Sequence, residues 1–399
     1  MRVRVPWLLV ISMNIFEKDS CYVASTYARF PLNLVSGKGS IVYDNNGKKY
    51  IDMATGIAVN TFGFCDDEWV KAVTEQLNTL QHASNLYYTK PCADLAEILC
   101  QRTGLKKVFF SNSGAEANEC AIKVARKYAC DKKGSDYYTI ITLKNSFHGR
   151  TITTLAATGQ DVFHTDFLPL TDGFVYAEAN NIADLLEKVK NNKVAAIMFE
   201  CVQGEGGVLP LEKSFVDAIF EIAKENDILT IADEVQTGNG RTGALYGFMN
   251  YGVLPDIIST AKGLGNGLPL GATMLGEKVK EVLTFSSHGS TFGGNPVACA
   301  GAISVVNRLD DELLNEVKAK SEYIFNTLKD ASGVKSVSGM GLMIGIETEK
   351  DAGEVIKYCM ENGVLPIKAK TKVRLLPALN IGWDELKAAV EIIKKGCEI

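Results

Sequence analysis

The sequence predicts an α/β protein with a large domain on a mostly parallel sheet and a smaller α+β domain after it. In the middle of the chain, short apolar and β-branched runs alternate with longer stretches of helical periodicity. That alternation is typical of βαβ units. After Pro296 an Ala-rich stretch leads into a second group of shorter strands and helices. A chain of 399 residues is long enough for both parts.

The individual elements follow from the same patterns. Residues up to about Val59 do not alternate, and glycine-containing turns at 37–39 and 45–47 separate short strands there. In the large domain we expect strands at 107–111, 138–143, 195–201, 229–233, 257–260 and 272–275, and helices at 115–128 and 215–223. In the smaller domain we expect strands within 334–347 and at 373–376, and helices at 352–362 and 383–395. The predicted divisions are 1–60, 61–288 and 289–399.

Composition excludes several classes of function. The chain has 42 basic and 47 acidic residues, well mixed, and therefore no basic stripe for nucleic acid. Its ten cysteines are scattered without the C-x-x-C spacing of zinc or redox sites, so we expect no metal and reduced thiols in the cytoplasm. No run approaches the roughly 20 apolar residues that a membrane-spanning helix needs.

The first twelve residues allow two interpretations. Two arginines and the apolar run from Pro6 to Ile11 have the profile of a secretion signal, although the run is very short. Alternatively, Met13 is the true start, because the residues after it are those of an ordinary soluble protein. We favour the second interpretation.

A candidate phosphate site lies in the run Ser111-Asn-Ser-Gly-Ala-Glu-Ala117, where a predicted strand ends and a helix begins. Ser113, Gly114 and Ala115 open that helix, and its first N–H groups and positive dipole end would favour a phosphate. A plain capped helix start explains the same residues.

A second strand end delivers a carboxylate, Asp233, followed three positions later by Gln236. A buried carboxylate facing a pyridine nitrogen would keep that nitrogen protonated. An aspartate at this place is more often only a cap.

A third strand end carries Lys262, with glycines at 263, 265 and 267. Such glycines let the backbone approach a ligand closely, and a lysine of lowered pKa forms imines with carbonyls. A surface lysine is the simpler alternative. Together the three strand ends could serve one phosphorylated cofactor, with a site for its phosphate, a carboxylate for its ring nitrogen and a lysine for its carbonyl. The spacing of the glycines fits no nucleotide-binding pattern.

The run Ser146-Phe-His-Gly-Arg150 places an aromatic ring and a guanidinium close together. Phe147 could stack on a flat ring, and Arg150 could bind a carboxylate with both arms of its fork. Taken singly, the two would be a core and a surface residue.

Together these segments resemble the class III aminotransferases, enzymes of fold type I that depend on pyridoxal 5′-phosphate, and within them the enzymes that act on acetylornithine. The resemblance runs from about Tyr27 to the C-terminus. Its most specific pieces are Phe110-Ser-Asn-Ser-Gly-Ala-Glu-Ala-Asn118, Ser146-Phe-His-Gly-Arg-Thr151, Gln203-Gly-Glu-Gly-Gly207, Asp233-Glu-Val-Gln-Thr-Gly238, Thr260-Ala-Lys-Gly263 and Ser290-Thr-Phe-Gly-Gly-Asn-Pro296.

The resemblance implies a seven-stranded sheet and a role for each matching residue. Lys262 would hold the cofactor as a Schiff base, Asp233 would pair with the pyridine nitrogen, and Phe147 would stack on the ring. Gln236 would contact the side of the ring hydroxyl. The remaining cofactor contacts would come from Ser113, Gly114 and Ala115, and from Thr291 of a partner subunit.

For the substrates, the resemblance implies that Arg150 holds the α-carboxylate of the donor and Arg374 the carboxylate of 2-oxoglutarate. Glu205 would pair with Arg374 while the donor is bound and release it for the acceptor. Ser290, again from a partner subunit, and Tyr27 would lie near the substrate. The implied assembly is a homodimer with shared active sites.

The expected reaction moves the terminal amine of N2-acetyl-L-ornithine to 2-oxoglutarate, a step of arginine biosynthesis. Alternatives are other ω-aminotransferases, whose donors include succinylornithine, ornithine, 4-aminobutyrate and succinyldiaminopimelate, and a pyridoxal-phosphate aminomutase. Gly56 argues against ornithine, since ornithine aminotransferases typically place a tyrosine there. Two departures from the family are Phe62-Gly-Phe64, where a Leu-Gly-His is usual, and Ala115, where threonine is common.

Overall fold

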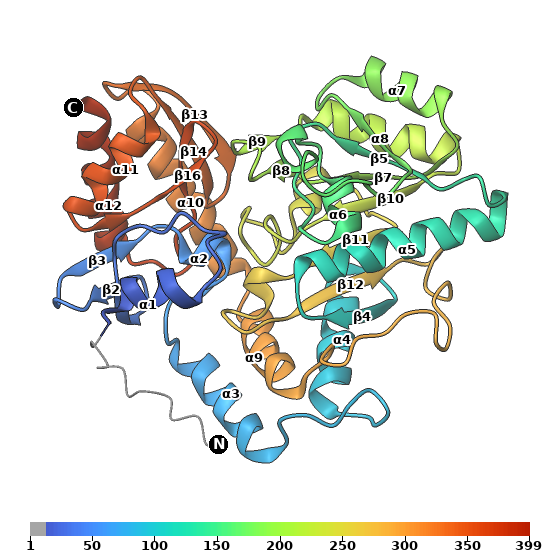
Figure 1. Ribbon diagram of the computed structural model, residues 1–399, viewed down its shortest axis with the longest axis horizontal. Helices are drawn as coiled ribbons and strands as arrows, with labels where there is room; N and C mark the ends of the chain where they lie inside the picture. Colours follow the sequence, from blue (N-terminus) through green and yellow to red (C-terminus); the bar gives the residue numbers. More distant parts are fainter. Residues whose placement is uncertain (1–12) are drawn as a thin grey trace, which may run out of the picture.

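A computed structural model describes residues 13–399 of the chain. Both interpretations of the N-terminus concern residues outside that range. Figure 1 shows the large sheet and its helices on one side and the smaller C-terminal part on the other. None of the helices in the described range is both long and apolar enough to cross a membrane.

The large sheet has seven strands in the order β4-β12-β11-β10-β7-β5-β6. Only β12 runs antiparallel to its neighbours, so the predicted mostly parallel sheet is confirmed. Its strands are β4 Lys107–Ser111, β5 Thr139–Leu143, β6 Phe174–Ala177, β7 Val194–Phe199, β10 Leu229–Asp233, β11 Ile257–Thr260 and β12 Gly271–Leu275. The sequence patterns had located six of these. β6 was missed because this edge strand is short and only partly buried.

Helices cover both faces of this sheet, which is why its central strands are apolar throughout. All six residues of β7 are buried. Ala196 and Met198 pack on the face covered by α5 (Gly114–Lys133), while Ile197 and Phe199 pack on the face covered by α8 (Lys213–Glu225). Helix α5 corresponds to the helix predicted at 115–128 and extends five residues further, to Lys133.

The other helices near this sheet surround it or follow its strands. They are α3 Asp67–Thr79, α4 Lys90–Thr103, α6 Ile152–Ala157, α7 Ile182–Asn191 and α9 Pro296–Asn307, with 3₁₀ turns η1 Asp161–Phe163, η2 Gly247–Tyr251 and η3 Lys262–Leu264. α9 packs on α3 and α4, and its N-cap is Asn295.

The C-terminal part contains a four-stranded sheet in the order β13-β14-β17-β16, with helices packed on it. These elements are β13 Val334–Met340, β14 Met343–Thr348, β16 Ile367–Ala369, β17 Lys372–Leu375, α10 Asp311–Leu328, α11 Ala352–Glu361 and α12 Trp383–Glu398. The region predicted as strand at 334–347 is thus a β13–β14 hairpin. A small pair, β8 Val202–Gln203 and β9 Leu209–Pro210, follows β7 in the chain.

The N-terminal segment forms a sheet with the C-terminal part. Strands β1 Leu34–Lys38, β2 Ile41–Asp44 and β3 Lys49–Asp52 are joined by β15 Val364–Leu365, which pairs with β3 in parallel. Helix α1 (Ile15–Tyr22) precedes them. Segments more than 300 residues apart in the sequence therefore lie side by side (Figure 1).

An unusual turn follows β3. Four consecutive residues, Thr55 to Ala58 (α2), have positive φ angles of 49°, 62°, 66° and 61°. Left-handed backbone is costly for residues other than glycine, above all for a β-branched residue such as Ile57. The buried carboxylate of Asp52 accepts hydrogen bonds from the N–H groups of Ala54 and Thr55, and the Thr55 hydroxyl donates to the carbonyl of Leu376. These contacts hold the turn next to β17.

Candidate active site

A cavity of about 570 Å³ lies beyond the C-terminal ends of β4, β7, β10 and β11. Ligands of open α/β sheets bind at this edge. Ten of the predicted site residues line the cavity: Tyr27, Ser113, Gly114, Ala115, Phe147, Arg150, Glu205, Asp233, Gln236 and Lys262. The structure therefore brings together residues that are more than 200 positions apart in the chain.

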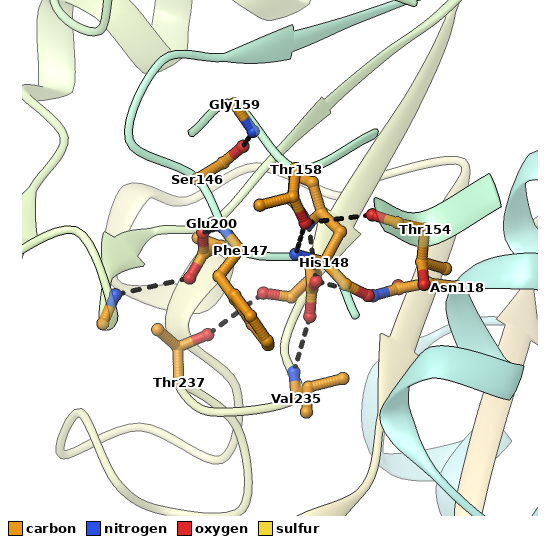
Figure 2. Close-up of polar contacts among 12 residues, drawn as sticks. Asn118, Ser146, Phe147, His148, Thr154, Thr158, Gly159, Glu200, Val235 and Thr237 are labelled. Carbon is orange, nitrogen blue, oxygen red and sulfur yellow. Dashed lines mark hydrogen bonds and ion pairs between the residues drawn. The ribbon is translucent and has the colours of Figure 1, made fainter. Parts of the chain in front are cut away.

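Asp233 lies at the end of β10 and is only 3% exposed. Its Oδ2 atom is 2.7 Å from both Nδ1 of His148 and Nδ2 of Asn118, and its Oδ1 atom accepts a hydrogen bond of 3.0 Å from the N–H of Val235. Figure 2 shows this network around His148. With three donors around it, the carboxylate is fixed in orientation inside the cavity wall.

His148, Asn118 and Glu200 were not singled out from the sequence, although the first two lie inside motifs quoted above. His148 Nε2 has no hydrogen-bond partner in the described chain, and neither has Asn118 Oδ1. Asn118 also donates to the carbonyl of His148 at 2.7 Å. The only sequence signal was their position: His148 follows Phe147 directly, and Asn118 is four residues after Gly114.

Glu200 follows β7 and lines the cavity next to Phe147. It accepts hydrogen bonds from the N–H groups of Phe147 at 2.8 Å and Gly204 at 3.3 Å. Its burial raises its pKa to about 7, and the neighbouring charge of Asp233 acts in the same direction. The carboxyl thus holds the backbone that carries the Phe147 ring (Figure 2).

Lys262 begins the 3₁₀ turn η3 after β11 and has a positive φ of 43°. Burial lowers the pKa of its ammonium group, opposed by the negative charge of Glu205. Among the described residues its Nζ atom has neither a hydrogen-bond nor an ion-pair partner. A lysine in this state can act as a nucleophile or a proton carrier more readily than one in water.

The start of α5 has the features expected of an anion site. Ser113 caps the helix by accepting a hydrogen bond from the N–H of Glu116. The N–H groups of Gly114 and Ala115 belong to the first turn, where N–H groups have no acceptor within the helix. A Cβ atom on Gly114 would lie 2.6 Å from Cγ1 of Val235. Glycine is therefore required for α5 to approach the end of β10 this closely.

Arg374, in β17, is buried and contacts two residues that line the cavity, Glu205 and Gln236. Its Nη1 atom is 2.6 Å from Oε1 of Glu205 and 3.2 Å from Oε1 of Gln236, whose Nε2 lies 3.3 Å from Glu205. Burial by itself would raise the pKa of the Glu205 carboxyl, but the charge and hydrogen bond of Arg374, the charge of Lys262 and the hydrogen bond of Gln236 together lower it. The predicted pairing of these residues is present, and Gln236 joins it rather than standing free.

Three predicted residues do not line this cavity. Arg374 contacts it through Glu205 and Gln236. Ser290 and Thr291 line a second one, together with Cys92 and His288. Ser290 Oγ nevertheless accepts a hydrogen bond of 3.1 Å from Asn112, which lines the first cavity. Within one chain, Thr291 thus lies outside the Lys262 cavity.

Gly56 also lies elsewhere, in a cavity with Asp52 and Asn60, although Val59, the residue after the turn, lines the Lys262 cavity. A Cβ atom on Gly56 would meet nothing nearer than 3.7 Å, so a larger side chain has room there.

The residues fit a phosphorylated pyridine aldehyde. A helix start with free N–H groups suits the phosphate, the fixed Asp233 carboxylate suits a protonated ring nitrogen, and Lys262 suits the aldehyde. Fold and site together thus define an enzyme of the pyridoxal-phosphate type.

Comparisons with known proteins specify the family. Residues 22–396 match the family model Aminotransferase class-III. The chain is 48% identical over 384 residues to the acetylornithine aminotransferase of Haemophilus ducreyi, covering 96% of this chain and 98% of that protein. It is 46% identical over 388 residues to that of Caldanaerobacter subterraneus, covering 96% and 98%. The chain therefore belongs to the class III aminotransferases, the family that its motifs resemble.

Solved structures agree. The N-acetylornithine aminotransferase from Stenotrophomonas maltophilia is similar with a TM-score of 0.82 at 34% identity, covering 93% of this chain and 96% of that one. The ornithine aminotransferase from Toxoplasma gondii is similar with a TM-score of 0.92 at 32% identity, covering 96% and 93%. Overall shape does not separate the two substrates.

Proposed function

We propose that this chain is a pyridoxal-phosphate aminotransferase that moves the terminal amine of N2-acetyl-L-ornithine to 2-oxoglutarate. The observation that carries the proposal is the cavity in which Lys262, Asp233 and the start of α5 converge. The names of the relatives at 46–48% identity support the donor. They also support a place in arginine biosynthesis, and we propose the cytoplasm as its location.

The cofactor, when bound, supplies the electron-withdrawing ring that stabilises a carbanion. The protein's own residues do the rest. Asp233, held by His148 and Asn118, would place a negative charge at the ring nitrogen. Lys262 would hold the cofactor's aldehyde group, and its free amine would carry a proton between carbon atoms. Phe147, which lines the cavity, would cover one side of the ring.

Substrate selection depends on two guanidinium groups. Arg150 at the cavity mouth binds the α-carboxylate of the donor, and Arg374 binds the second carboxylate of 2-oxoglutarate. While the donor is present, Glu205 neutralises Arg374 through the 2.6 Å contact, since an unpaired buried guanidinium is costly. A dicarboxylate displaces Glu205, which is the more exposed partner of this pair.

The active unit in this proposal is a homodimer in which Ser290 and Thr291 serve the partner's site. Large apolar side chains are exposed in or beside the segments that line the Ser290 cavity, namely Leu86, Tyr88 and Phe285. Exposed apolar groups of this size mark association surfaces. A second copy of the chain would cover them.

The first test measures the donor half-reaction without 2-oxoglutarate. Adding N2-acetylornithine should remove the visible absorbance of the bound cofactor faster than ornithine, succinylornithine or 4-aminobutyrate does. Faster loss with another amine would change the donor but not the class of enzyme. Protein that takes up no pyridoxal phosphate would overturn the proposal, and turnover without any oxo acid would favour an aminomutase.

Glu205 provides a second test. Glu205→Gln should impair the donor half-reaction more than the acceptor half, because Arg374 loses its neutralising partner when only the monocarboxylate donor is bound. Single-turnover absorbance measurements of each half separate the two. An equal loss in both halves would contradict the assigned role.

A further inference from the structure

Arg150 is held by aromatic rings rather than by acids. Its guanidinium carbon lies 4.2 Å from the centre of the Phe163 ring and 5.4 Å from that of Phe147. The two rings meet edge to face, with centres 5.9 Å apart and planes at 76°. Both distances are inside the range of cation–π attraction, and Phe163 is the nearer ring.

No hydrogen-bond acceptor and no carboxylate partners the Arg150 guanidinium within residues 13–399. This differs from Arg374, which has Glu205 at 2.6 Å. Arginine has five N–H donors in a fixed planar fork. A stacked ring leaves all of them free while it restricts the plane in which they lie.

Phe163 is itself fixed, although it lies in the short turn η1 beside the exposed Val162. On one side of it, Nε2 of Gln160 donates to the carbonyl of Ser146 at 3.0 Å. On the other, the ring of His164 lies 3.0 Å from the carbonyl of Leu155 and packs on Tyr176. The turn is therefore attached to both ends of the segment that carries Arg150.

Phe163 does not line the Lys262 cavity, whereas Arg150 and Phe147 do. A ligand in the cavity would touch the guanidinium and not the ring behind it. Any influence of Phe163 on a ligand must therefore pass through Arg150 or Phe147.

We propose that Phe163 is a positioning residue that orients the Arg150 fork toward a carboxylate of the ligand, and so selects carboxylate-bearing amines over neutral ones. The inference rests on the proposed function in one respect, namely that Arg150 binds the donor's carboxylate. An oriented fork binds a carboxylate through two parallel hydrogen bonds, and a freely rotating one loses conformational entropy on binding. The effect is specific to ligands with a carboxylate.

The test compares two unreactive ligands on the enzyme loaded with its cofactor. N-acetyl-L-norvaline has the carbon chain and carboxylate of N2-acetylornithine without the terminal amine. The second ligand, N-acetyl-L-norvalinamide, has a neutral carboxamide in place of that carboxylate. Dissociation constants for both are measured by calorimetry in the unaltered protein and in Phe163→Leu, Phe163→Tyr and Arg150→Ala. Phe167→Leu is the matched control, because Phe167 follows the same turn and is 57% exposed.

Phe163→Leu should weaken binding of the acid about fivefold, equivalent to about 1 kcal/mol, and leave binding of the amide unchanged. Phe163→Tyr keeps an aromatic face and should restore acid binding, and Phe167→Leu should alter neither ligand. If Phe163→Leu weakens the binding of the acid and the amide equally, its role is merely structural and the inference is overturned. Unchanged binding of the acid would overturn it as well.

Arg150→Ala separates the two levels of the proposal. If it abolishes the preference for the acid while Phe163→Leu leaves that preference intact, the positioning role falls and the proposed role of Arg150 stands. If Arg150→Ala leaves the preference intact, the carboxylate site itself is wrong and the inference falls with it.

Discussion

At the scale of single residues, Glu200 gives the protein a pH dependence. Burial raises the pKa of its carboxyl from 4.5 to about 7, with Asp233 acting in the same direction. Because this pKa is higher in the folded than in the unfolded chain, the associated stabilisation is complete below pH 4.5 and is lost as the pH rises through about 7. The free energy of unfolding, measured by denaturant titration, should therefore contain a component that falls by about 2 kcal/mol between pH 5 and 8.

Glu200→Gln removes this component, because the amide does not titrate. The difference between the unaltered protein and the variant should depend on pH and change mainly between the unfolded pKa of 4.5 and the folded pKa of about 7. Glu221→Gln, at an exposed position of α8, serves as the control and should show no such difference. A difference for Glu200 that is constant from pH 5 to 8 would show that the group titrates as an exposed carboxyl does.

The residues that could be predicted from the sequence are those whose chemistry is unusual for their place. Lys262 after a strand, among glycines, is one, and Asp233 at the end of an apolar strand is another. His148, Asn118 and Glu200 could not be predicted in the same way. Their roles depend on which way each side chain points after the chain has folded, and a buried polar residue inside a motif carries no mark of its hydrogen-bond partner.

At the scale of elements, the site depends on how closely α5 approaches the end of β10. A Cβ atom at position 114 would lie 2.6 Å and 2.8 Å from the two γ carbons of Val235. Gly114→Ala should therefore displace Val235, destabilise the protein by roughly 1–3 kcal/mol and weaken cofactor binding. Thermal unfolding and a cofactor titration measure the two effects.

Val235→Ala provides the control for that substitution. If the clash is the cause, the double variant Gly114→Ala with Val235→Ala should be more stable than the sum of the two single effects predicts, by at least about 0.5 kcal/mol. Simple additivity would instead place the cost of Gly114→Ala in some other contact, such as the backbone of the helix start.

Helices and strands with a clear periodicity of apolar residues could be predicted from the sequence. Segments whose conformation depends on contacts distant in the chain could not. The strand that ends at Asp233 and the strand before Lys262 are confirmed with their predicted bounds. The left-handed turn at Thr55 to Ala58 was not anticipated, because Ile57 disfavours it locally. It is held by the carboxylate of Asp52 and by a hydrogen bond to Leu376, more than 300 positions away.

At the scale of the whole molecule, the sequence could place Ser290 and Thr291 in the active site only through family resemblance. Nothing in the local pattern indicates that a loop serves another subunit. In the structure this loop lines a cavity of its own, separate from that of Lys262. The arrangement is what a single chain would show if Thr291 completes the site of a partner, and the partition of residues between two chains is open to a direct experiment.

Mixing two inactive variants tests this partition. Lys262→Ala removes the reactive amine, and Thr291→Asp places a negative charge against the cofactor's phosphate. If Thr291 acts on the partner, a heterodimer of the two variants contains one site with an intact Lys262 and an intact Thr291. Random exchange of subunits in an equimolar mixture then restores about a quarter of the activity of the unaltered dimer.

If Thr291 acts within its own chain, every site in the mixture lacks one of the two residues and no activity returns. Denaturing and refolding the variants together, with each one refolded alone as the control, ensures that subunits have exchanged. Mass spectrometry of the intact assembly confirms that heterodimers have formed. Heterodimers without activity would therefore refute the shared site, because assembly itself would have succeeded.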